Sequence, residues 1–459
     1  MQNTKFKSVC RVIGIAVACF AGTLATLLCL FVLSSLIPRE RIKENLQASA
    51  TCLQESESLF YQLSTGDRRT EIHNYADATT LNIMYSIDGE DCLKEIFLSP
   101  FYSDKVNLEK SLIELLVERV TFERPADTLY DRYWHGMILI LRPLFVLFTL
   151  QQIREIFLGV LLICMLILSV MLWKRNQRVP VGIIWLAALL VQLPMVAFCV
   201  EYFPVFLITF LLSMAMIRWE EKRVRILGLC VVSGTCVAFF DFLTTETVAF
   251  VVPLALVYLL WEKKGTLKSL KEELCYLAGA AVSWAGSYIL TYLVKWMFSS
   301  LVYGKERFSV ALSQFAGRQG NEVVSFALDS LSNNKISPEA LDNAGGELLP
   351  QAVSAIVINV RLLLGLSGKI TLERLALFMV VVGFLLIAIV FLFRKTGNIG
   401  VLPVILFLLG CIPPARMMIL HNHSIEHCFF VYRSLFGTIL CLTMGMVYLV
   451  NWDWLRRKR

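Results

Sequence analysis

The chain has 459 residues, of which 57% are hydrophobic and only 17% are charged, against roughly 25% charged residues in soluble domains. This composition excludes a water-soluble globular protein, because an aqueous fold cannot bury so large an excess of apolar sequence. The formal net charge is +7, but the Lys and Arg residues lie in short clusters between apolar runs. Such clusters are typical of membrane orientation signals, so we predict no nucleic-acid partner.

Ten apolar runs occur along the chain, and most are long enough to cross a bilayer as helices. In chain order they cover residues 12–36, 157–173, 181–199, 204–217, 226–242, 247–260, 276–297, 375–393, 399–413 and 429–450. The first run exceeds the roughly 7–15 apolar residues of a signal peptide and lacks a clear cleavage site, so we predict that it is a retained span. The sequence therefore predicts an all-α polytopic integral membrane protein, with about ten transmembrane helices in a single domain, residues 1–459.

Basic clusters orient the predicted spans. They precede the first span and follow the second, fourth, sixth, eighth and tenth. If the N-terminus is cytoplasmic, alternation places every cluster on the cytoplasmic side, as the positive-inside rule requires. We therefore predict a multi-pass protein of the cell membrane with both termini in the cytoplasm. The alternation leaves two long extracytoplasmic segments, residues 38–155 and residues 298–374.

The first outer segment contains apparent amphipathic helices, such as residues 106–120. It ends in an apolar stretch, residues 137–150, that is too short to span a bilayer and is interrupted by Arg142 and the proline after it. We expect this stretch to lie in the membrane interface or to re-enter the bilayer. Cys52 and Cys92 also lie in this segment, and the sequence leaves open whether they form a disulfide or stay free thiols.

The second outer segment carries Gly and Asn clusters between residues 305 and 351, which predict a long loop with short helices. Its basic residues are suited to clamping an anionic headgroup. Arg318 is the substrate-binding candidate among them. The alternative is ordinary solvated surface, because any water-exposed loop carries such residues.

All five histidines are predicted to lie on the outer side, and three of them form the densest polar cluster of the chain: His421, His423 and His427. His423 and His427 are spaced i,i+4 and would share one face of a helix. We favour hydrogen bonding to a phosphate or a sugar by this cluster and by Arg433. Two alternatives stay open: a zinc site with His421 or Glu426 as a third ligand, and interfacial histidines that anchor a helix end.

Two carboxylates are candidates for proton transfer. Asp77 stands alone among small and apolar neighbours, and a carboxylate desolvated in this way can act as a general base. Asp241 is its rival, because it follows two phenylalanines at the predicted bilayer edge, and Glu246 lies in the same tight turn. Acids placed there usually face a cavity or a partner. Helix capping is the alternative role for these acids.

The start of the apolar stretch at residue 137 is rich in aromatic residues, with Tyr133, Trp134 and His135 in succession. Anchoring in the membrane interface is one interpretation of this pattern. Arg142 interrupts the apolar run and needs a partner. We therefore count His135 and Arg142 as candidates for substrate binding.

The layout of the chain resembles the GT-C membrane glycosyltransferases, since one span is followed by a large outer segment with a lone Asp, many further spans and a long late outer loop. Four short segments are similar to those of uncharacterised multi-pass bacterial proteins grouped near that superfamily: residues 74–82, 133–143, 241–245 and 421–433. The resemblance implies that a sugar passes from a polyprenyl-phosphate-linked donor, held in membrane lipid, to a cell-envelope glycan or polymer on the outer face. It also implies that Asp77 is the catalytic base.

Other classes of protein stay open. A transporter or flippase would place charged residues at mid-bilayer on broken helices, and few occur here, Arg142 and Lys295 among them. A non-enzymatic partner in envelope polymer assembly would need no convergence of acids and histidines. An outer-face acyltransferase with His135 as base is a further alternative. No cofactor follows from any motif, and a divalent cation is left open.

Overall fold

The structure of the protein is a computed structural model that describes residues 2–56, 60–62, 67–107, 109–304, 308, 348–365, 383 and 400–450. Arg318 and the predicted span at 375–393, apart from residue 383, lie outside these residues. The regular secondary structure of the described residues is helical apart from two antiparallel two-stranded sheets. These sheets pair β1 (Phe60–Gln62) with β2 (Glu71–His73), and β3 (Pro100–Phe101) with β4 (Thr128–Leu129).

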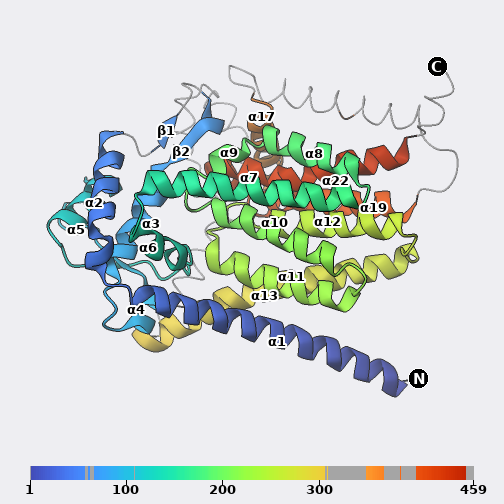
Figure 1. The fold of residues 1–459 in the computed structure, drawn as a ribbon, viewed down its shortest axis with the longest axis horizontal. Coiled ribbons are helices and arrows are strands. Elements are labelled where there is room, and N and C mark those ends of the chain that lie inside the picture. The colour runs from blue at the N-terminus through green and yellow to red at the C-terminus, as the bar shows by residue number, and fades with distance from the viewer. Residues whose placement is uncertain are drawn as a thin grey trace.

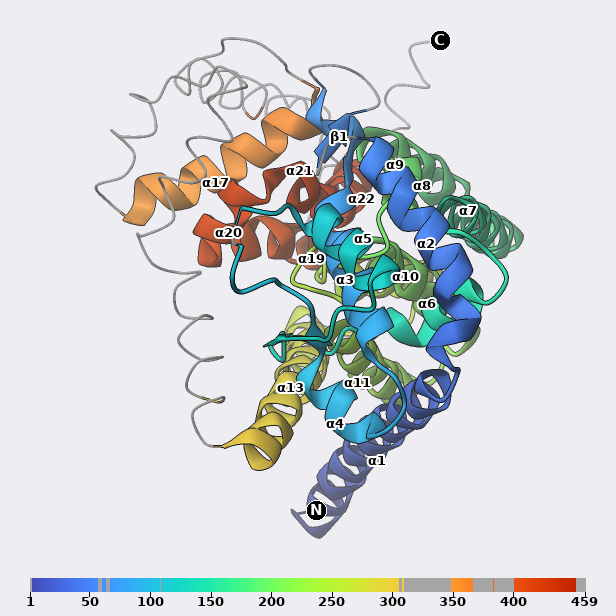
Figure 2. The same cartoon turned by 90° about the vertical axis from the view of Figure 1, so that its left-hand side faces the viewer.

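Long helices lie side by side along the longest axis of the molecule and form a bundle (Figure 1). The bundle contains α1 (Gln2–Ser35), α7 (Leu150–Lys174), α8 (Arg178–Leu190), α9 (Leu193–Val196), α10 (Phe203–Arg218), α11 (Arg223–Phe240), α12 (Val248–Lys263), α13 (Leu270–Tyr303), α19 (Val401–Ile419) and α22 (Leu435–Leu449). One end of it carries α2 (Arg39–Glu55), η1 (Arg68–Thr70), α3 (Asn74–Ser86), α4 (Cys92–Leu98), α5 (Leu112–Thr121), α6 (Ile138–Phe145), α17 (Leu348–Leu363), α20 (His421–Glu426), α21 (Cys428–Val431) and η3 (Tyr432–Ser434). We call residues 39–145 the cap, and Figure 2 looks onto this end of the molecule.

Six of the described helices are long and apolar enough to cross a membrane, which makes the chain a polytopic α-helical membrane protein. They cover Arg11–Ser35, Leu150–Lys174, Arg223–Phe240, Leu270–Val302, Val401–Ile419 and Cys428–Leu449. The predicted class is thus confirmed, whereas the predicted count of ten is not. The predicted span at 181–199 is broken at Gln192, whose backbone is left-handed with φ 54°, into α8 and α9. The spans at 204–217 and 247–260 form α10 and α12, each of 16 residues.

Burial divides the bundle helices into lipid-facing and central ones. Only 17% of the most apolar stretch of α1 and 33% of that of α7 is buried inside the protein, so both present apolar side chains outward, as lipid-facing helices do. In α12, by contrast, every residue from Val248 to Trp261 is buried. A helix that is apolar all round and buried all round belongs at the centre of the bundle.

Small residues let central helices approach closely. At Gly234 of α11 an added Cβ would lie 2.2 Å from the backbone oxygen of Trp284 in α13. Such contact through glycine is typical of membrane helix pairs, which associate by close packing rather than by the hydrophobic effect.

Three of the basic loops meet at the end of the bundle opposite the cap. The Lys263 ammonium donates to the backbone oxygen of Arg175 at 2.6 Å, and Lys264 lies 3.1 Å from Glu220. These contacts join the loops that follow α7, α10 and α12. The N-terminal end of α1 lies at the same end of the molecule (Figure 1). These four clusters, which the sequence assigns to one side of the membrane, are therefore together in space.

The cap folds against the other end of the bundle. Its helix α5 begins after Ser111, which forms a reciprocal capping box with Glu114, so it starts later than the predicted 106–120. Lys295 of α13 donates to the backbone oxygen of Ile96 at 2.6 Å, and Ser299 donates to that of Phe97 at 2.8 Å. The C-terminal part of the long helix α13 thus binds the cap through α4. Cys52 and Cys92 are free thiols in the structure.

Arg142 lies in α6, within the apolar stretch expected at the interface, and it is fully buried. Its guanidinium donates to the backbone oxygen of Ile37 at 2.9 and 2.6 Å, and to those of Met84 and Ile87 at 2.8 and 2.7 Å. It thereby ties the corner between α1 and α2 to the C-terminal end of α3. All the hydrogen bonds that it makes in the described structure go to backbone carbonyls, which favours a structural role over substrate binding.

Replacement of Arg142 by Lys is expected to destabilise the protein by about 1–3 kcal/mol. A lysine keeps the charge but cannot reproduce the guanidinium fork, so at least one of the three buried carbonyls loses its donor. The measurement is the thermal midpoint in detergent together with abundance in the membrane. Arg124→Lys is the matched control, because Arg124 is an exposed residue of the same segment. An unchanged midpoint for Arg142→Lys would contradict this role.

Candidate functional site

The turn between α11 and α12 presents a buried carboxylate. Asp241 directly follows α11, is 2% exposed, and accepts hydrogen bonds from the Thr244 amide at 3.2 and 3.0 Å and from the Thr244 hydroxyl. Among the described residues, no cationic side chain pairs with it. Burial, and then the neighbouring Glu246 carboxylate, raise the pKa of Asp241 well above its ordinary value.

This turn is braced by two helices from the C-terminal part of the chain. Arg416 of α19 lies 2.6 Å from the Glu246 carboxylate and donates to the backbone oxygen of Leu243 at 2.5 Å. The Nε2 of His423 in α20 donates to the same oxygen at 2.7 Å. Leu243 has φ 66°, a left-handed conformation that is unusual for a branched residue. Both Glu246 and His423 were predicted to bind substrate. His423 holds the backbone beside Asp241 directly, and Glu246 does so through Arg416.

An aromatic wall stands next to Asp241. The ring of His135 lies 5.0 Å from those of Tyr130 and Phe242, and the Tyr292 hydroxyl donates to the Asp241 backbone oxygen at 3.0 Å. His135 donates from Nε2 to the backbone oxygen of Tyr130 at 3.0 Å. Burial, and then the charge of Lys295, lower the pKa of His135 to about 3. A ring that stays neutral in this way is a weak base, which argues against the acyltransferase alternative.

Asp77 lies in the first turn of α3 and is completely buried. One of its oxygens is 2.6 Å from the Arg154 guanidinium of α7, and the other accepts from the Val200 amide at 3.0 Å. The same Arg154 guanidinium also donates to the side-chain oxygen of Asn74 at 3.1 Å. Among the described residues, Asp77 is thus paired with a buried cation, unlike Asp241, and joins α3, α7 and the segment before α10, so its geometry suits positioning better than proton transfer.

Glu201 is a further acidic residue at the cap end, which the sequence did not single out. Its side chain is 13% exposed and lies 3.6 Å from Nδ1 of His73. Its Oε2 has no hydrogen-bond partner in the described part of the chain. Burial is the main reason why the pKa values of Asp241 and Tyr75 are raised, and the negative charge of Glu201 raises both further. The only sequence signal was an acid flanked by Val200 and aromatic residues at the end of an apolar run.

The C-terminal histidines are brought to the same end of the bundle but do not converge on one point. The rings of His423 and His427 lie 4.5 Å apart, and His427 stacks on Phe430. His421 is buried, and its Nε2 has no hydrogen-bond partner among the described residues. Within that same portion, the one three-residue group with metal-binding geometry does not include these histidines. The zinc alternative at this cluster thus lacks support.

Arg433 is also buried and binds backbone groups. It donates to the Phe429 oxygen at 2.8 Å and to the Arg69 oxygen at 3.0 Å, and its guanidinium lies over the ring of Tyr202. It thereby joins η3 to η1. Asp241, Glu246, His135 and His423 gather around one turn, whereas Arg142 lies apart from it at the junction of α1, α2 and α3.

Comparison with known proteins adds no assignment: no protein-family model, no curated protein and no solved structure matches the chain. The chemistry of the site is therefore inferred from its side chains alone. It offers a carboxylate with a raised pKa, a second carboxylate nearby, and aromatic surface at the end of a membrane bundle. Such a constellation is suited to proton transfer on a substrate held at the membrane surface.

Proposed function

We propose that this protein transfers a sugar from a polyprenyl-phosphate-linked donor to a cell-envelope acceptor on the outer face of the cell membrane. The observation that carries the proposal is Asp241, a buried carboxylate without a cationic partner in the described structure, beside an aromatic wall at the cap end of a membrane bundle. Membrane helices with outward apolar faces, such as α1 and α7, provide surface for a polyprenyl chain.

In the proposed reaction Asp241 takes the proton of the acceptor hydroxyl while the hydroxyl oxygen attacks the anomeric carbon. The bond from that carbon to the phosphate oxygen breaks, and the phosphate leaves with the electron pair. Arg132 is the cation assigned to the leaving phosphate. It is half-buried in the cap, its guanidinium lies 4.6 Å from the Tyr130 ring, and its charge acts on the Tyr75 hydroxyl.

The direct test is transfer by the purified protein with a panel of polyprenyl-phosphate and polyprenyl-diphosphate sugars and envelope glycans as acceptors. We expect release of the lipid phosphate together with a glycosylated acceptor. Sugar-lipid that crosses the bilayer of proteoliposomes without release of phosphate would instead indicate the flippase alternative. Neither product with any donor, for a folded protein, would contradict the proposal.

The proposal includes an orientation, with the cap outside, both termini in the cytoplasm and about ten spans. We expect a cysteine introduced at Val106, which is 97% exposed in the cap, to react with an impermeant maleimide in intact cells. A cysteine at Asn176, exposed in the loop after α7, should react only after permeabilisation. Labelling is measured as the increase over the parent protein, which has its own cysteines. Reversed accessibility would place the site in the cytoplasm and remove an outer-face reaction.

A further inference from the structure

Three side chains with metal-binding atoms converge where the cap meets the bundle, and the sugar-transfer proposal uses none of them. His73 ends β2, and Cys199 and Glu201 lie in the short segment before α10. One ligand atom from each lies within 4.8 Å of the other two, and His73 Nδ1 lies 3.6 Å from Glu201 Oε2. In a tetrahedral zinc site, with metal–ligand bonds of roughly 2.0–2.3 Å, such atoms are about 3.3–3.8 Å apart. Small side-chain rotations are enough to close the difference.

We propose that His73, Cys199 and Glu201 form a zinc-binding site. Imidazole, thiolate and carboxylate are all zinc ligands, and a thiolate disfavours Mg²⁺ and Ca²⁺, which prefer oxygen. Three protein ligands leave the fourth coordination position for water or a substrate oxygen, as in catalytic rather than structural zinc sites. The site stands independently of sugar transfer.

The surroundings of the three side chains are suited to a cation. Glu201 Oε2 is a buried oxygen with no hydrogen-bond partner within the described residues, a cost that a bound cation would remove. Zinc binding displaces the thiol proton of Cys199 into solution, so the ligand set then carries a thiolate, a carboxylate and a neutral imidazole.

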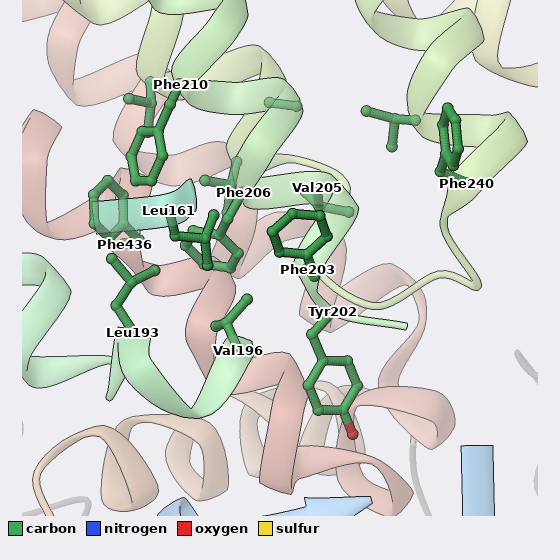
Figure 3. Close-up of a cluster of buried hydrophobic side chains, with 14 of the residues drawn as sticks. Leu161, Leu193, Val196, Tyr202, Phe203, Val205, Phe206, Phe210, Phe240 and Phe436 are labelled. Carbon is green, nitrogen blue, oxygen red and sulfur yellow. The ribbon is translucent and has the colours of Figure 1, made fainter. Parts of the chain in front are cut away.

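The backbone that carries the ligands is held rigidly. Val200, between Cys199 and Glu201, donates its amide to Asp77, which is itself paired with Arg154. Tyr202 lies at the edge of a packed apolar cluster that includes Phe203 and Phe206, and its hydroxyl points away from that cluster (Figure 3). The same hydroxyl lies 2.9 Å from Nδ1 of His73. Coordination through Nδ1 would replace this hydrogen bond, so Tyr202 competes with the metal for the ring.

The test uses the full-length protein in detergent, stripped with a chelator and then loaded with Zn²⁺ or Co²⁺. We expect one zinc per chain by elemental analysis and a thiolate-to-cobalt charge-transfer band. Cys199→Ala should abolish this band. His73→Ala and Glu201→Gln should each weaken zinc binding at least about 100-fold, because loss of even an outer-shell partner typically costs roughly 10–100-fold.

Two variants separate metal binding from a purely structural role. Cys230→Ala is the matched control, because Cys230 is also buried but lies in α11, outside the three-residue group. The Cys230→Ala protein should bind zinc as tightly as the parent. Tyr202→Phe releases His73 Nδ1 and should bind zinc as tightly or more tightly. The proposal is overturned if folded parent protein shows no thiolate-to-cobalt band, or if Cys199→Ala keeps it.

Discussion

Replacement of Asp241 by Asn is expected to lower the turnover of sugar transfer by roughly 10²–10⁴-fold, the usual contribution of general acid–base catalysis. The amide keeps the shape and can still accept the Thr244 hydrogen bonds, but it cannot take the acceptor proton. A base acts in the transition state, so donor affinity should change little. The measurement is steady-state transfer with the donor that the panel identifies.

The pH dependence of the parent protein gives a second test of Asp241. A general base works when deprotonated, so the rate should fall on acidification through the pKa of this carboxyl. Because burial raises that pKa, the fall should occur at a higher pH than the roughly 3.9 of an ordinary Asp. Asp241→Asn should remove this acidic limb from whatever activity is left.

Asp127→Asn provides the matched control for Asp241→Asn. Asp127 is an acid of the cap that, like Asp241, accepts from an amide and a hydroxyl of one residue, here Ser103, at 2.8 and 2.9 Å. It lies outside the turn, so its loss should leave turnover within a few-fold of the parent. Near-normal turnover of folded Asp241→Asn protein would exclude Asp241 as the base.

The membrane helices follow from the sequence because length and hydropathy are local properties. The runs at 12–36, 157–173 and 276–297, for example, correspond to α1, α7 and α13, which are apolar and long enough to span. The break inside 181–199 depends instead on the left-handed backbone of Gln192, which hydropathy does not report. Pro194, two residues later, was the available sign of that break.

The candidate site could be predicted only in part, because its geometry depends on distant partners. Asp241 and Glu246 share a turn in both sequence and structure, at the cap end of the bundle. Asp77 looked isolated along the chain, yet its cation, Arg154, lies 77 positions away. Likewise His73 meets Glu201 only after folding. Spacing along a chain does not report such pairs, so Asp77 seemed unpaired and Glu201 was missed.

Asp77→Asn is expected to destabilise the protein rather than to remove its chemistry. The substitution leaves the Arg154 guanidinium buried without its carboxylate, and breaking a buried ion pair from one side costs roughly 3–5 kcal/mol. Arg154→Met should cost a similar amount, because it leaves the Asp77 charge buried and unpaired. We expect both variants to show lower membrane abundance and a lower thermal midpoint in detergent.

The double variant Asp77→Asn/Arg154→Met distinguishes this pairing role from catalysis. With both charges gone, no unpaired charge stays buried, so the combined loss of stability should be smaller than the sum of the two single losses. Protein that does fold should retain turnover within about tenfold of the parent, which a catalytic base could not allow. If Asp77→Asn instead folds with normal stability and loses turnover by roughly 10²-fold or more, then Asp77 is the base. The ion pair seen here would in that case open during the reaction to release the carboxylate.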